Sequence, residues 1–193
     1  TNICGTNASG KTTLQRLVPV FFGEQPNRVV PKTRKKFDEF YLPFSNSYIV
    51  YEYQRENGDI CQVVLTRKND GGVDYRFINA PYHSDQYLQH TAEGVKGHSY
   101  NDWAAAMRSL ADVQVSHKIS ATSEYRSIIQ NDAAALRGNN ADSVKLRRLA
   151  ASFSLVSSGH KLRHIEKLVS AVHAKEGKMD TLKAMLAAIF EED

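Results

Sequence analysis

The sequence predicts an α/β fold built from three parts in chain order. A glycine-rich loop opens a helix, an antiparallel β lobe follows at about residues 45–80, and a helical segment ends the chain. Three observations carry this prediction: a phosphate-loop pattern that starts at Gly5, a hydrophobic period that changes to two at Ser47, and apolar spacing of three to four residues near the C-terminus. We therefore expect a first domain over residues 1–140 and a helical segment over residues 141–193.

The loop pattern G-x-x-x-x-G-K-[ST] is met without a mismatch. Its glycines let successive backbone N–H groups converge on one anion, Lys11 can reach the outer phosphates of a nucleotide, and the Thr12 hydroxyl can ligate Mg²⁺. Asn2–Cys4 has the character of a short buried strand, and Thr12–Phe22 has helical apolar spacing. The residues expected to bind the nucleotide are Gly5, Thr6, Asn7, Ala8, Ser9, Gly10, Lys11, Thr12 and Thr13.

Positive charge is concentrated beside this loop, because residues 1–36 hold seven Lys and Arg against one acidic residue. Much of it follows the first helix, which Pro19 should kink or shorten before Gly23. One interpretation of the basic run is a solvated charged face. The other is contact with a phosphate of the nucleotide or of a DNA backbone, and such DNA binding would be independent of sequence. The candidates for that contact are Arg28, Lys32, Arg34, Lys35 and Lys36.

The middle of the chain predicts an antiparallel meander. Ser47–Arg55, Ile60–Arg67 and Val73–Ile78 are rich in aromatic and β-branched residues, and turn sequences separate them at Glu56–Asp59 and Asn69–Gly72. We expect the tyrosines of these strands to be half-buried sheet residues rather than a base-stacking platform, because few basic residues lie among them.

A loop is expected over residues 79–100. His83, His90 and His98 are expected on its surface, because their spacing does not suit a metal site. Asn101–Asp102 then predicts the cap of a helix whose apolar residues recur every three to four positions.

Two structures are open for Tyr125–Gln130: a short strand, or part of a helix that starts near Thr122. A strand would place Gln130 beside the helix cap Asn131–Asp132, where its amide could reach a nucleotide-bound Mg²⁺ or the attacking water. In a helix, Gln130 would be an exposed side chain.

The last fifty residues are expected to be helical, with apolar stripes over residues 144–153, 162–172 and 182–189. Their length does not by itself establish a coiled coil.

The composition predicts a globular protein without a membrane segment, because no apolar run approaches the roughly 18 residues of a membrane span. Cys4 and Cys61 are too few for a disulfide scaffold, which favours a reducing cytoplasmic compartment. The phosphate loop begins four residues after Thr1, and we expect the chain to be a fragment.

The string Asn2–Leu14 resembles the G-x-N-x-x-G-K-[ST]-[ST]-L loop of the SMC, SbcC, RecN and MukB group of ATPases. In that group an antiparallel meander follows the first helix, then a strand that ends in the Q-loop glutamine, then helices that lead into a long coiled coil. The order of elements expected here is similar over most of the chain, although only the loop is specific. The resemblance implies the N-terminal half of an ABC-type ATPase head, with residues 141–193 beginning the coiled-coil arm.

Carried over by position, the resemblance makes Lys11 a ligand of the β- and γ-phosphates of ATP. It makes Thr12 the Mg²⁺ ligand and Gln130 the Q-loop glutamine, also near Mg²⁺. Arg28 or Arg34 becomes a candidate for the basic loop near nucleotide and DNA. In this group the catalytic contribution of such a segment is positioning and charge neutralisation.

The signature motif, the Walker B aspartate and the catalytic glutamate of that group are not recognised in these 193 residues. Glu191–Asp193 is set aside as a Walker B motif because a helix, not a strand, is expected before it. The chain should therefore contact phosphate and Mg²⁺ but lack the general base.

In the full protein, the resemblance implies that ATP joins two copies of the head and that hydrolysis releases them, clamping or moving double-stranded DNA with the help of accessory subunits. Pro19 and the ending Phe21–Gly23 are unusual for chromosomal members and indicate a divergent one, such as an SMC-like subunit of a bacterial anti-plasmid or anti-phage defence system. Two alternatives use the same loop: a P-loop kinase or GTPase-like switch, and a nucleotide-stabilised scaffold for partner subunits.

Overall fold

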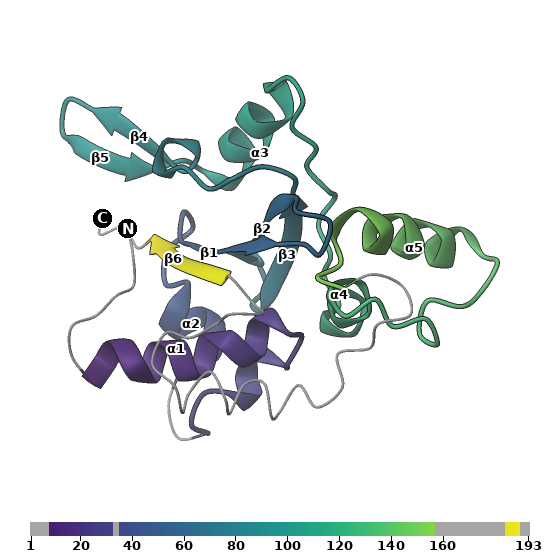
Figure 1. The fold of residues 1–193 in the computed structure, drawn as a ribbon. Coiled ribbons are helices and arrows are strands. Elements are labelled where there is room, and N and C mark those ends of the chain that lie inside the picture. Colours follow the sequence, from purple (N-terminus) through teal and green to yellow (C-terminus); the bar gives the residue numbers. More distant parts are fainter. Residues whose placement is uncertain (1–7, 33–34, 157–183, 190–193) are drawn as a thin grey trace.

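The computed structural model describes residues 8–32, 35–156 and 184–189, of which 8–14 and 184–189 are described by their backbone alone. It has a mixed α/β architecture in which a four-stranded antiparallel sheet lies between two layers (Figure 1). In the described helices, we find none with the length and apolar content needed to cross a membrane.

The sheet has the strand order β3-β2-β1-β6, and all neighbours are antiparallel. Its strands are β1 (Tyr48–Gln54), β2 (Ile60–Arg67), β3 (Val73–Ile78) and β6 (Ala184–Ile189). The meander β1-β2-β3 confirms the prediction to within one residue at each end, because the turn sequences fix where each strand stops.

The tyrosines of β1 are fully buried, not half-buried as expected, because the sheet is covered on both faces. Tyr48, Tyr51 and Tyr53 are at most 2% exposed. Tyr51 and Tyr53 belong to the core on one face, and Tyr48 to the core on the other.

The helices on the first face are α1 (Ala8–Phe21), α2 (Phe37–Tyr41), α4 (Thr122–Ile129) and α5 (Ala141–Phe153), and a short 3-10 turn, η1 (Pro26–Arg28), joins α1 to α2. Aromatic rings dominate the core between these helices and the sheet, with the rings of Tyr75 and Tyr125 stacked at a centroid distance of 4.2 Å. Buried members of this core include Leu17, Val20, Phe21, Phe37, Val63, Phe77, Ile128, Ala150 and Phe153.

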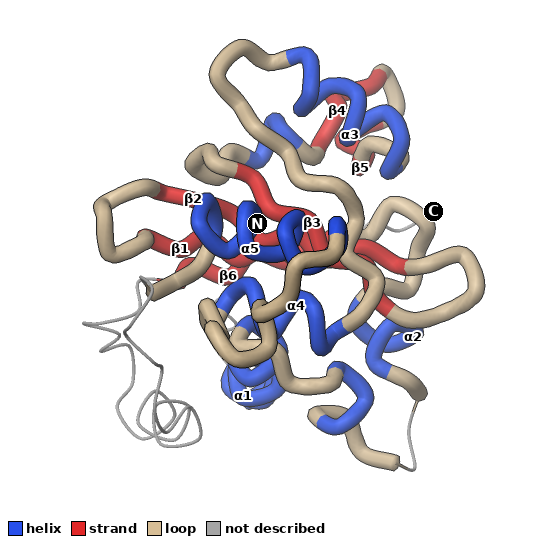
Figure 2. Tube along the Cα trace, turned by 90° about the vertical axis from the view of Figure 1, so that its right-hand side faces the viewer, coloured by secondary structure: helices blue, strands red, loops and turns tan. Residues whose placement is uncertain are grey.

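The second face carries α3 (Tyr100–Ser109), and a hairpin of β4 (Leu88–Thr91) and β5 (Gly94–Gly97) projects on the same side (Figures 1 and 2). Trp103 of α3 is fully buried there beside Tyr48 and Tyr87. The guanidinium of Arg76 lies 5.5 Å from the centre of the Trp103 ring. Burial lowers the pKa of Arg76.

Residues 79–100 are not the continuous loop that was expected. They hold the 3-10 turn η2 (Ser84–Gln86) and the β4-β5 hairpin. Apart from Leu88 and Gly97, the residues of these strands are exposed, so no apolar alternation reveals them in the sequence. The cap of α3 is Ser99, whose hydroxyl accepts the N–H of Asp102 at 3.2 Å, rather than Asn101.

The expected helix over residues 182–189 is wrong, since residues 184–189 form β6. The reason for setting Glu191–Asp193 aside therefore no longer holds, and those residues lie outside the described part of the chain. The stripe at 162–172 and the strand at Asn2–Cys4 also lie outside it. The stripe at 144–153 is confirmed as part of α5.

The expected boundary at residue 140 does not separate two structural units. Ala150 and Phe153 of α5 are buried in the same core as α1 and the sheet, and β6 is a strand of that sheet. Within residues 141–156, the chain therefore completes the globular core rather than leaving it as an arm.

Candidate functional site

The phosphate-loop pattern runs into the N-terminal end of α1. Gly5, Thr6 and Asn7 lie outside the described residues, and α1 begins at Ala8, earlier than the expected Thr12. Because the first N–H groups of a helix have no intrahelical acceptor and the first turn of α1 contains no acidic residue, this end suits an anion. The pattern residues that lie in α1 are Ala8, Ser9, Gly10, Lys11, Thr12 and Thr13.

The second half of α1 is fixed firmly against the sheet. Leu17 and Val20 are fully buried, and the Tyr51 hydroxyl of β1 donates to the Leu17 carbonyl at 2.8 Å. Burial raises the pKa of Tyr51 well above its ordinary value, which keeps this donor protonated. The helix ends at Phe21, two residues after Pro19 and one residue before the expected end at Phe22.

Three side chains from α4 and its C-terminal cap hold the last carbonyl of α1 and the two carbonyls that follow it, and we call them the α4 clamp. The Tyr125 hydroxyl donates to the carbonyl of Phe21 at 2.5 Å. In the same way Arg126 Nε donates to Gly23 at 2.8 Å, and Gln130 Nε2 to Phe22 at 2.6 Å. The Tyr125 bond satisfies a carbonyl that the helix end leaves without a partner, and the other two bonds hold the segment just after the helix, so α4 is tied to the end of α1.

Of the two structures left open for Tyr125–Gln130, the helix that starts near Thr122 is confirmed by α4, and the strand, which the resemblance also implied, is wrong. Gln130 is the C-terminal cap of that helix and is half-buried, with its amide on the Phe22 carbonyl. This point lies about 20 Å along α1 from Ala8, at 1.5 Å per residue. The structure therefore does not bring Gln130 to the phosphate loop, and a direct contact with Mg²⁺ there does not fit this geometry.

Of the basic residues after α1, Arg28 has contacts that place it near the C-terminal end of that helix. Arg28 pairs with Glu24 at 3.5 Å, and the Glu24 N–H donates to the carbonyl of Pro19 near the end of α1. The Arg28 side chain is 76% exposed. Lys32, Lys35 and Lys36 are exposed, and Arg34 lies outside the described residues.

The histidines of residues 79–100 are placed by local contacts. His83 and His90 are exposed, and His98 is half-buried. His90 Nε2 lies 3.8 Å from Oδ1 of Asp85. Among the described residues, no group of three or more His, Cys, Asp or Glu side chains gathers in a way that could hold a metal ion.

Sequence reasoning missed Tyr125 and Arg126 of the clamp, and it missed three arginines that line a cavity near α5, Arg55, Arg137 and Arg147. The members of each group come together only in the fold, with no shared local motif, so no pattern in the sequence could have found them.

Comparison with curated proteins finds no match for this chain. The family model described as Protein of unknown function (DUF3584) matches residues 1–193, which is the full length of the sequence. The chain that carries the phosphate-loop pattern and the clamped helix α1 therefore belongs to the DUF3584 family.

Proposed function

We propose that this chain is the ATP-binding N-terminal half of an SMC-like ATPase head. The observation that carries the proposal is the full G-x-x-x-x-G-K-[ST] match that continues directly into α1. Lys11 contacts the β- and γ-phosphates of ATP, Thr12 ligates Mg²⁺, and the N–H groups at the start of α1 surround the phosphates.

The anchoring of α1 supports this role. A helix that ends in the α4 clamp and buries Leu17 and Val20 moves little when an anion binds at its other end. The binding free energy is then not spent on ordering the helix, which is the advantage of a preorganised site. Charge adds to it, because Lys11 lies in the pattern and the first turn of α1 contains no acidic residue, which favours an anionic ligand.

In the full protein, ATP joins two copies of the head, and hydrolysis releases them while double-stranded DNA is clamped or moved. DNA is bound through its phosphates without sequence preference, with Arg28 and Arg34 as candidate contacts beside Lys32, Lys35 and Lys36. Accessory subunits take part, and the setting is the bacterial cytoplasm or nucleoid, in plasmid or phage defence, chromosome maintenance or DNA repair.

The test is ATP turnover by the full-length protein, measured with and without double-stranded DNA. Lys11→Ala should lower turnover at least about a hundred-fold, because it removes a charge that stabilises the transferring phosphoryl group. The matched control is Lys145→Ala, which removes the same charge from an exposed position on α5.

Each outcome selects one function. Turnover that DNA stimulates and Lys11→Ala abolishes supports the SMC-like head. Turnover indifferent to DNA favours a P-loop kinase or switch. If the cellular function survives Lys11→Ala, the nucleotide has no catalytic role and the protein is a scaffold for its partners.

A further inference from the structure

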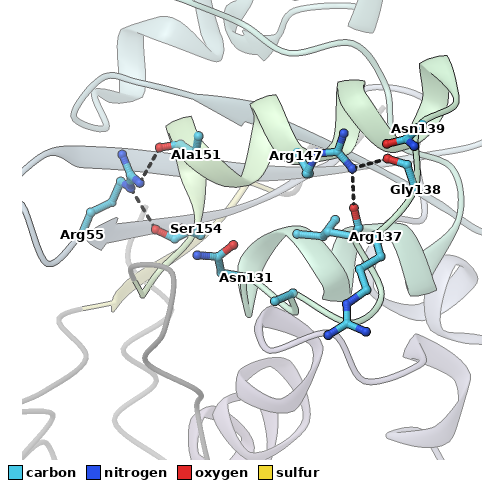
Figure 3. A pocket seen from close by; sticks show the side chains of 10 residues that line it. Arg55, Asn131, Arg137, Gly138, Asn139, Arg147, Ala151 and Ser154 are labelled. Carbon is cyan, nitrogen blue, oxygen red and sulfur yellow. Dashed lines mark hydrogen bonds between the residues drawn. The ribbon is translucent and has the colours of Figure 1, made fainter.

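A cavity of about 630 Å³ opens between the end of β1, the segment after α4 and the outer side of α5 (Figure 3). Arg55 stands at one end and Arg147 at the other, with Asn131 between them. Arg137 also lines it, and none of the ten described residues around the cavity is acidic. Three guanidinium groups therefore share one concave space.

Arg55 is held rigidly although it is charged. Its side chain is only 12% exposed, and it donates from Nε to the Ser154 carbonyl at 2.9 Å and from Nη2 to the Ala151 carbonyl at 2.8 Å. Arg55 Nη1 also lies 3.8 Å from Oδ2 of Asp59, whose side chain is 64% exposed, which is a long and solvent-screened pair. The backbone carbonyls carry no net charge, and the Asp59 pair is screened by solvent, so the positive charge of Arg55 is only weakly compensated by these three partners.

Arg147 is fixed in a similar way from α5. Its Nη1 donates to the carbonyls of Leu136 at 2.9 Å and Gly138 at 2.5 Å, which leaves Nη2 and Nε free of these two bonds. Arg137 stands in the same turn, is exposed, and has no partner for its side chain among the described residues. Backbone carbonyls orient the guanidinium groups of Arg55 and Arg147 but do not neutralise them.

We propose that this cavity binds a small phosphate-bearing anion of nucleotide size, at a site separate from the phosphate loop. Guanidinium groups match phosphate oxygens with paired N–H donors, and those of Arg55 and Arg147, which backbone carbonyls orient, cost little entropy to organise. The volume lies in the range of small-molecule sites, and Asn131 adds a polar contact between the two ends.

A small ligand fits the burial better than a nucleic-acid backbone does. A duplex is a rigid, convex surface that contacts exposed side chains. Arg137 and Arg147 are exposed, but the Arg55 side chain is only 12% exposed, so a duplex would not contact all three. An anion that enters the cavity contacts a lining that holds three arginines and no acidic residue among the described residues.

The test uses the full chain with Lys11→Ala, so that binding at the phosphate loop does not supply the signal. Its thermal midpoint is measured against increasing pyrophosphate and, separately, AMP. At about a hundred-fold excess over Kd, either probe should raise the midpoint by about 5–10 °C. Arg147→Gln and Arg137→Gln should each weaken the response at least ten-fold, while Arg148→Gln, the neighbouring exposed arginine of α5 that does not line the cavity, should not.

Absence of a shift with both probes overturns the proposal, as does an equal response in Arg137→Gln and Arg148→Gln. Arg137→Gln decides the matter if Arg147→Gln fails to fold, because the Arg137 side chain supports no described bond. A short DNA duplex is added as a competitor, and if it displaces pyrophosphate only when Arg147 is present, the cavity belongs to a nucleic-acid surface instead. ATP turnover is absent from this assay, so its result is independent of the function proposed above.

Discussion

Replacing Gly23 with alanine should destabilise the protein by about 2–4 kcal/mol. Gly23 follows α1 with φ at +100°, where a side chain costs about 1–2 kcal/mol. A Cβ there would lie 2.6 Å from Cβ and 2.7 Å from Cγ of Arg126, so α4 would have to shift. That shift weakens the bond from Arg126 Nε to the Gly23 carbonyl and its neighbours in the clamp, which adds about 1–2 kcal/mol.

The matched control is Gly58→Ala in the turn between β1 and β2. Gly58 has a similar φ of +93°, but nothing lies within 4 Å of the Cβ it would gain. Both variants therefore share the backbone cost, and the difference between them isolates the contact with Arg126. Urea unfolding followed by the fluorescence of Trp103, the single tryptophan, gives both free energies of unfolding. Equal losses in the two variants would refute a clamp that depends on close approach of α1 and α4.

Three further outcomes are expected. Gln130→Ala should lower the free energy of unfolding by about 1 kcal/mol, because the bond from Gln130 to the Phe22 carbonyl is lost. The ATP turnover of the full-length protein should not change. If turnover falls while ATP affinity is kept, the Q-loop role of Gln130 is restored. Burial raises the pKa of Cys61 to about 11, so in a Cys4→Ser background its reaction with a thiol reagent at pH 8 should be slow and should accelerate on unfolding; fast labelling of the folded chain contradicts this. The double variant Glu191→Gln, Glu192→Gln should keep its ATP turnover, because the general base is expected outside the 193 residues. A steep loss of turnover would assign the Walker B role to Glu191 or Glu192.

The meander could be predicted from the sequence because local and tertiary signals agree there. Ile60–Arg67 is rich in β-branched residues, which favour a strand. Asn69–Gly72 contains only Asn, Asp and Gly, which favour a turn. The same agreement located α1 and α5, whose apolar stripes are the faces that they bury.

Prediction failed where tertiary pairing overrides local preference. Ala184–Ile189 contains alanine, leucine and methionine, which favour a helix, yet it pairs with β1 as a strand. Long-range pairing of this kind leaves no trace in a local window.

The candidate site could be predicted in part for a related reason. The phosphate loop is a contiguous pattern, so it can be recognised in the chain alone. The clamp joins Tyr125 and Gln130 to Phe21 and Phe22, which precede the β meander in the sequence and lie 104 and 108 residues away along the chain. Such contacts exist only in the fold. The amide of Gln130 and the helix cap beside it suggest a Mg²⁺ or water contact in the sequence, but in the fold this amide donates to the Phe22 carbonyl.

The pairing of β1 with β6 has a consequence for how the protein is made. The outer edge of β3 is protected early, because Tyr75 and Ile119 exchange two backbone bonds of 2.9 and 2.8 Å. The edge of β1, by contrast, stays open until the ribosome has released Ala184–Ile189, since these residues supply its partner strand. During synthesis the half-finished sheet therefore presents a bare strand edge, the structure that most readily recruits strands from other chains. Shorter versions of the protein that stop after α5 should keep that edge and self-associate through it.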